Sequence, residues 1–142
     1  MAKTIDLEVI TPSETFYSGP VNIVIVNTAT GEEGFMANHA WACKILAPGK
    51  LWIKEQEGGE FRCAVVSGGF VDVKDTIHLF ADSAEWLEDI DLERAEAAKE
   101  RAEKTLRNED HTATPYELNK AEIHLARAKA RIKAVHDGPN RK

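Results

Sequence analysis

Residues 61–81, FRCAVVSGGFVDVKDTIHLFA, decide the fold of the first half of the chain. Three runs rich in β-branched and aromatic residues, 61–66, 70–74 and 76–81, are separated only by the turn sequences SGG and KD. Short apolar runs with such tight breaks are typical of β-strands joined by hairpins. We therefore predict three consecutive antiparallel strands in this stretch.

The same pattern extends toward the N-terminus. Apolar and acidic residues alternate over 5–9, and the sequence TPS that follows marks a turn. The β-branched run VNIVIV at 21–26 indicates a strand in the core of a sandwich, and 51–55 is a further strand before the turn EGG. Many short strands without intervening helices predict an all-β sandwich or barrel, for which about 85 residues supply a modest core.

The composition changes near residue 85. Eight of the nine glycines precede this point, and the chain beyond it is dominated by Ala, Glu, Lys and Arg. Asp91 is the expected N-cap of a first helix, and TPYE at 114–117 is a capping box that starts a second helix, which Gly138 ends. We expect two domains, a β-domain at 1–85 and an α-helical hairpin at 86–142. The loop between the two helices of the hairpin is short, so the helices should pack antiparallel.

The predicted seam between the two helices is weak. Its apolar positions, many of which are alanines, are spaced by three and four residues. They are Ala95, Ala98, Ala102, Leu106, Leu118, Ala121, Leu125, Ala128, Ile132 and Val135. Alanine buries little apolar area, so each contact contributes far less than a leucine contact would. We expect the hairpin to separate easily from its partner surface.

Four arginines on the predicted helices lack ordinary partners. Arg101, Arg127 and Arg131 have no Asp or Glu three or four residues away, and Arg94 has only Asp91. Antiparallel packing brings the four guanidinium groups to one face, where they require an anion. A polyphosphate suits arginine forks best. The alternative is that these side chains are solvated or meet acids on the β-domain.

Composition and spacing exclude several classes of function. The 142-residue chain carries a formal net charge of −6, which argues against nucleic-acid binding. It has no apolar run long enough for a membrane helix and no signal-like or transit-like start. Cys43, Cys63 and the five histidines show no metal or redox spacing, and neither Ser67 nor the pair Asp72 and Asp75 belongs to a catalytic set. We therefore expect no enzyme activity, no metal and a reducing compartment.

Two motifs resemble the epsilon subunit of F-type ATP synthases, of bacterial type. They are VVSGGFVDV at 65–73 and IDLERA at 90–95, and the order of β-domain and helices agrees. The resemblance implies a sandwich of about ten strands followed by a two-helix hairpin, in a non-catalytic rotor subunit. It further implies contacts with the gamma subunit and the c-subunit ring, and an extended hairpin that enters the alpha/beta hexamer and blocks ATP hydrolysis. Its implied location is the cytoplasmic face of the bacterial plasma membrane, in an enzyme that moves protons or sodium ions, without insertion of this chain into the membrane.

The resemblance also implies particular site residues. No cofactor is required, but ATP is the implied regulatory ligand of the folded hairpin, at Glu85, Ile90, Asp91, Arg94, Ala95, Arg101, Arg127 and Arg131. The loop GEEGFMANHAWA at 31–42 departs from the family pattern, yet it keeps Glu32 and His39 as expected ring or gamma contacts. Other readings remain open: a stand-alone ATP sensor, a purely structural coupling subunit whose ATP site is silent, and, more distantly, a free enzyme.

Overall fold

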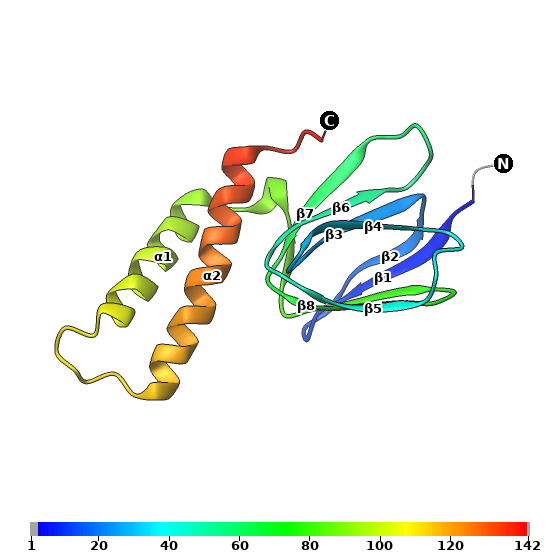
Figure 1. The fold of residues 1–142 in the computed structure, drawn as a ribbon. Coiled ribbons are helices and arrows are strands. Elements are labelled where there is room, and N and C mark those ends of the chain that lie inside the picture. Colours follow the sequence, from blue (N-terminus) through cyan, green and yellow to red (C-terminus); the bar gives the residue numbers. More distant parts are fainter. Residues whose placement is uncertain (1–2, 142) are drawn as a thin grey trace.

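The computed structural model describes residues 3–141 and shows a β-domain followed by two helices (Figure 1). The strands are β1 (Ile5–Ile10), β2 (Thr15–Val21), β3 (Ile23–Thr28), β4 (Gly31–Met36), β5 (Ala42–Leu46), β6 (Gly49–Lys54), β7 (Phe61–Val66), β8 (Gly69–Val73), β9 (Ile77–Ala81) and β10 (Ala84–Trp86). A short 3-10 helix η1 (Leu87–Asp89) leads to α1 (Leu92–Arg107) and α2 (Pro115–Asp137). The sandwich followed by helices is the predicted architecture.

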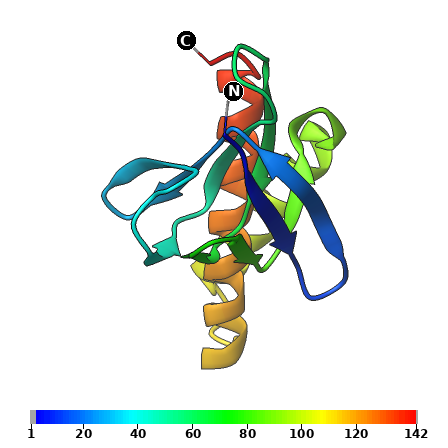
Figure 2. The same ribbon diagram turned by 90° about the vertical axis from the view of Figure 1, so that its right-hand side faces the viewer.

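The ten strands form one hydrogen-bonded sheet that folds over itself. Its order is β10-β7-β6-β3-β5-β8-β9-β1-β2, and β4 pairs with β3 beside that path. Neighbours are antiparallel except β1 and β9, which run parallel. The folded sheet (Figure 2) encloses one apolar core. Its fully buried side chains include Leu7, Phe35, Leu51, Val71 and Leu79.

The alternation of strand side chains creates a second, smaller apolar surface outside this core. Ile25, Trp52 and Cys63 lie opposite one another on β3, β6 and β7, so their side chains share the outer face of the sheet. All three are buried, and Leu87 of η1 packs against them. We call this row of three residues the docking face, because the helices cover it.

The sequence pattern located the strands after about residue 50 better than the strands before it. The run VNIVIV, predicted as one strand, is divided: β2 ends at Val21 and β3 begins at Ile23. The bend lies at Asn22, whose buried backbone N–H donates to the carbonyl of Lys54 at 2.7 Å. The pattern also missed β2, β4, β5 and β10, because their exposed or mixed side chains do not alternate clearly.

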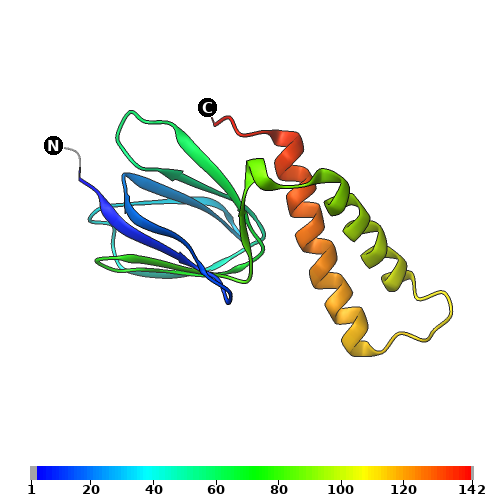
Figure 3. The same cartoon turned by 180° about the vertical axis from the view of Figure 1, so that it is seen from behind.

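Both helices begin as predicted, and α2 also ends as predicted. The Asp91 carboxylate accepts a hydrogen bond from the Arg94 backbone N–H at 3.2 Å, and the Thr114 hydroxyl accepts one from the Glu117 N–H at 3.1 Å. Gly138 caps the end of α2. The helices pack antiparallel, and α2 lies between α1 and the sandwich (Figures 1 and 3).

The buried residues of the helical pair are all alanines. They are Ala95 and Ala102 on α1, and Ala121, Ala128 and Ala134 on α2. Because these side chains bury little area, the hydrophobic contribution to the closed hairpin is small. The hairpin is also held to the sandwich by the apolar docking face and by polar links such as the Arg131–Glu85 pair.

Candidate functional site

A polar pocket lies where the sandwich passes into the first helix. It has a cavity volume of about 400 Å³ and is lined by Glu85, Asp89, Ile90, Asp91, Arg94, Ala98, Arg101 and Arg131. This volume falls within the roughly 300–1,000 Å³ typical of small-molecule sites. The pocket combines residues from β10, the following turn, α1 and α2, so it exists only while the hairpin is folded.

A second pocket continues along the groove between the helices. It has a volume of about 360 Å³ and shares Ala98, Arg101 and Arg131 with the first. Arg127, Lys120 and His124 of α2 also line it, and Glu117 is its acidic residue. The first pocket holds both signs of charge, whereas the second is predominantly cationic.

Arg127 has an unusual environment in the cationic pocket. Its Nε atom is buried, and among the described residues it has no hydrogen-bond partner. A buried polar atom without a partner costs free energy, and a charged group costs more. Arg127 is therefore prepared to donate to an acceptor that enters the pocket.

Arg131 is already paired. Its Nε donates to Glu85 Oε1 of β10, and both side chains are about 30% exposed. The strand register explains the contact, because Lys50, Val65 and Glu85 lie opposite one another on β6, β7 and β10 and face outward toward α2. For Arg131, the alternative that an acid of the β-domain supplies the partner is correct.

The structure brings together seven of the eight residues predicted for the ATP site. Glu85, Ile90, Asp91, Arg94, Arg101, Arg127 and Arg131 all line the two connected pockets. Ala95 does not, since it is 1% exposed within the helical seam. Sequence reasoning missed Lys120 and His124, although both precede Arg127 on α2 at helical spacing and face the same groove.

Cys63 on the docking face makes the closed structure sensitive to alkaline pH. Burial raises the pKa of its thiol from 9.0 to about 11. Between these two values the unfolded thiol has lost its proton while the folded one keeps it, so stability falls as pH rises. We expect the free energy of unfolding to fall between pH 9 and 11 by up to about 3 kcal/mol from this group. Urea unfolding at pH 8 and 10.5 checks this, and Cys63→Ala, which has nothing to titrate, should show a correspondingly smaller decrease.

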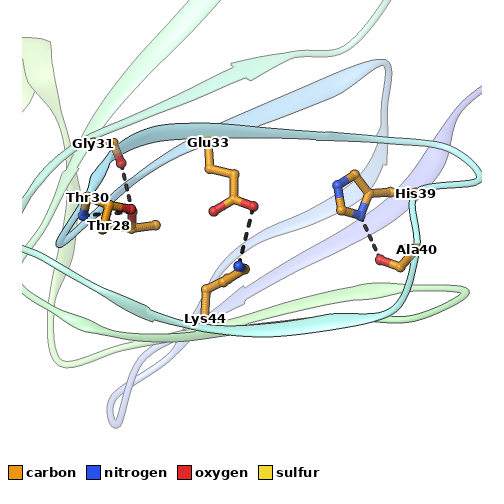
Figure 4. Close-up of polar contacts among 7 residues, drawn as sticks. All are labelled: Thr28, Thr30, Gly31, Glu33, His39, Ala40 and Lys44. Atoms are coloured by element: carbon orange, nitrogen blue, oxygen red, sulfur yellow. Dashed lines mark hydrogen bonds and ion pairs between the residues drawn. The ribbon is translucent and has the colours of Figure 1, made fainter.

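Glu32 and His39, the predicted contacts to the ring or gamma, lie in the region of β4 and the loop after it. His39 Nδ1 is 2.6 Å from the Ala40 carbonyl oxygen (Figure 4). The His39 ring also packs edge-on against Phe35. In the same view Glu33, the additional acid of this divergent segment, pairs with Lys44 of β5 at 3.7 Å. Glu32 and His39 are thus separate from the two pockets.

Exposed apolar side chains gather on another part of the sandwich. Ile45, Phe70 and Phe80 lie opposite one another on β5, β8 and β9, and the two phenylalanine rings stack at 4.9 Å between centroids.

Among residues 3–141 the structure contains no cluster of three or more His, Cys, Asp or Glu suited to a metal ion. None of its helices over the same range is long and apolar enough to cross a membrane.

Comparison with known proteins gives matches over both parts of the chain. Residues 4–87 match the family model of the ATP synthase delta/epsilon chain β-sandwich domain, and residues 88–136 match the long α-helix domain of the same chain. Similar relatives named ATP synthase epsilon chain occur in Caldanaerobacter subterraneus, 42% identical over 94% of both chains, and in Desulforamulus reducens, 41% identical over 95% of this chain and 99% of the other.

Solved structures give a corresponding result. A chain of the Euglena gracilis mitochondrial ATP synthase, from a cryo-EM structure of OSCP, F1 and c-ring, superposes with a TM-score of 0.74 and 30% identity. The superposition covers 94% of this chain and 82% of that one. A chain from the central stalk and c-ring of the Tetrahymena thermophila enzyme, at 15% identity and a TM-score of 0.57, shares the fold.

Proposed function

We propose that this chain regulates ATP hydrolysis through its helical hairpin. The chain belongs to the ATP synthase delta/epsilon family and is a non-catalytic component of the central stalk. In this proposal the folded hairpin binds ATP and does not inhibit. The extended hairpin reaches the alpha/beta hexamer and inhibits. The observation that carries the proposal is the convergence of Arg101, Arg127 and Arg131 on one groove, with the Arg127 Nε buried and without an acceptor.

The groove has the chemistry that a nucleoside triphosphate requires. Arginine forks match phosphate oxygens, and the cationic pocket offers Arg101, Arg127 and Lys120 for them. The polar pocket beside it, with Ile90 and the carboxylate of Glu85, is then left for the nucleoside. The ligand touches β10, α1 and α2 at once, so it binds the folded form only.

Binding to one form of the hairpin converts ATP concentration into a conformational signal. A ligand present at ten times its dissociation constant stabilises the form that binds it by about 1.4 kcal/mol. This is significant for a hairpin whose buried seam consists of alanines. At low ATP the folded form loses this contribution and extension becomes easier.

The likeness to known stalk proteins supports the partners of this proposal. The Euglena chain lies in an assembly that contains F1 and the c-ring. We propose that the β-domain, residues 1–85, contacts the gamma subunit and the c-ring through the region of Glu32 and His39, and that residues 86–142 carry the regulatory hairpin. The assembly would lie at the cytoplasmic face of a bacterial plasma membrane and move protons or sodium ions.

Calorimetric titration of the full chain with ATP tests the ligand. We expect saturable one-to-one binding, and at least about a tenfold loss of affinity in Arg94→Ala, because a charged hydrogen-bond donor that lines the pocket left for the nucleoside is removed. Arg107→Ala is the matched control, since Arg107 also lies on α1 but pairs with Glu109 at 3.6 Å and lines neither pocket. It should bind as the parent does. Absence of binding at millimolar ATP would favour a structural coupling subunit with a silent site, and binding that Arg94→Ala leaves unchanged would place the nucleotide elsewhere.

A further inference from the structure

We propose that the C-terminal tail, residues 138–141, is a latch that holds the helical hairpin against the sandwich, with Arg141 as its anchoring side chain. The tail leaves the end of α2 and runs beside β6 and β7 (Figures 1 and 2). It lies beyond residue 136, where the match to the family's helical domain ends. Its partner Glu32 lies within residues 4–87, which match the sandwich domain.

The local sequence directs the tail away from the helix axis. Gly138 adopts φ 78°, which favours glycine, and its N–H donates to the Ala134 carbonyl to close the last turn of α2. Pro139 follows and cannot extend the helix, because it has no N–H to donate. The chain therefore turns at the helix end and reaches the sheet within three residues.

Arg141 makes the principal contact of the tail. Its Nη1 and Nη2 atoms donate to the two carboxylate oxygens of Glu32 on β4, at 2.8 and 3.2 Å. The guanidinium carbon lies 5.4 Å from the ring centroid of Trp52 and 5.7 Å from that of Phe61. The Arg141 side chain is only 25% exposed. A two-bond fork with aromatic neighbours is stronger than an ordinary surface ion pair, and lysine does not reproduce it.

A second contact fixes the start of the tail. Lys50 Nζ of β6 donates to the Gly138 carbonyl at 2.5 Å and lies 5.0 Å from the Trp52 ring centroid. Trp52 faces outward from the sheet, yet it is only 4% exposed. The tail and α2 together thus cover the docking face, and removal of the tail contacts should loosen that cover.

The latch differs from the other ionic link between hairpin and sandwich. Within residues 3–141 two ion pairs join these parts, Arg131 with Glu85 and Arg141 with Glu32. The first lies inside the proposed nucleotide site, so a phosphate that engages Arg131 competes with Glu85. The second touches neither pocket of that site and keeps the hairpin docked while Arg131 is engaged. Only this consequence rests on the proposed function; the latch itself is measured without nucleotide.

Cys63 supplies an internal reporter of opening. It is 5% exposed on the docking face, next to Trp52 and under Leu87, whereas Cys43 is exposed. In a Cys43→Ser background the reaction of a thiol reagent with Cys63 measures how often the hairpin leaves the sheet. The full chain is used at pH 8 without nucleotide, and urea unfolding of each variant is measured in parallel.

The latch predicts a specific order of rates. Arg141→Ala and Glu32→Gln should each speed Cys63 modification by about tenfold, which corresponds to loss of a charge-assisted hydrogen bond. Their combination should be no faster than either alone, and Arg141→Lys should be intermediate. Lys133→Ala is the control, because Lys133 pairs within α2 with Asp137 at 3.0 Å, and it should leave the rate unchanged.

Three results would overturn the latch. One is an Arg141→Ala rate within twofold of the parent. Another is additive acceleration in the double variant with Glu32→Gln, which would mean that the two residues act independently. The third is a fall in the urea midpoint that accounts for the faster reaction, since this would reflect unfolding of the sandwich. In a separate arm, ATP added to Arg141→Ala should slow the reaction again; if it does not, the nucleotide proposal fails while the latch stands.

Discussion

Gly69→Ala is expected to lower the free energy of unfolding by more than about 4 kcal/mol. Gly69 begins β8 with φ +136°, where a side chain is strained. A Cβ atom built there lies 1.8 Å from the carbonyl oxygen of Phe80 and 2.9 Å from the Ala81 Cα. Both obstacles are backbone of the paired strand β9, so the strands themselves must separate.

A matched control distinguishes the clash from the strain of the backbone angle. Gly31 has a similar φ of +123°, but a Cβ there has no heavy atom within 4 Å. Gly31→Ala should therefore cost only about 1–2 kcal/mol of conformational strain. Urea unfolding monitored by tryptophan fluorescence measures both variants. Equal losses in the two would show that the close approach of β9 is not the cause.

The features that sequence reasoning located are those set by local chemistry. The turn sequence SGG, the Asp91 cap and the Thr114 capping box each involve neighbours within a few residues, and each lies where it was predicted. The helical spacing of the arginines also predicted correctly that Arg101 and Arg131 meet at one groove. Periodicity thus sufficed wherever the contact follows from the geometry of one helix or one hairpin.

The features that it missed depend on contacts distant in sequence. Glu85 pairs with Arg131 because β10 joins the edge of β7 and turns this carboxylate outward, and the strand β10 itself was not predicted. Arg141 reaches Glu32 across 109 positions, after the helix pattern has ended. The bend at Asn22 is fixed by the carbonyl of Lys54 on another strand. No local pattern carries this information, because the partner is chosen by the folded sheet.

Reversal of the charges of Arg127 and Arg131 is expected to abolish both proposed actions of the hairpin. Arg127→Glu with Arg131→Glu removes two cations from the groove and places a glutamate beside Glu85. We expect ATP affinity to fall at least about a hundredfold, since two charge-assisted hydrogen bonds are lost. We also expect the assembled ATP synthase to hydrolyse ATP without inhibition by this chain, because an acidic surface of the catalytic hexamer would repel the altered helix.

Two further variants separate this mechanism from a general effect of charge or folding. Lys129→Glu with Lys133→Glu changes the net charge equally and with the same spacing on α2, but neither residue lines the two pockets, so binding and inhibition should persist. Arg127→Gln with Arg131→Gln removes the cations without creating repulsion and should retain the circular dichroism of the parent. If the nucleotide and the hexamer compete for the same two arginines, both activities disappear together in the glutamate and glutamine variants. Loss of ATP binding with inhibition intact would mean that other residues of the extended hairpin contact the hexamer, and the competition model would be wrong.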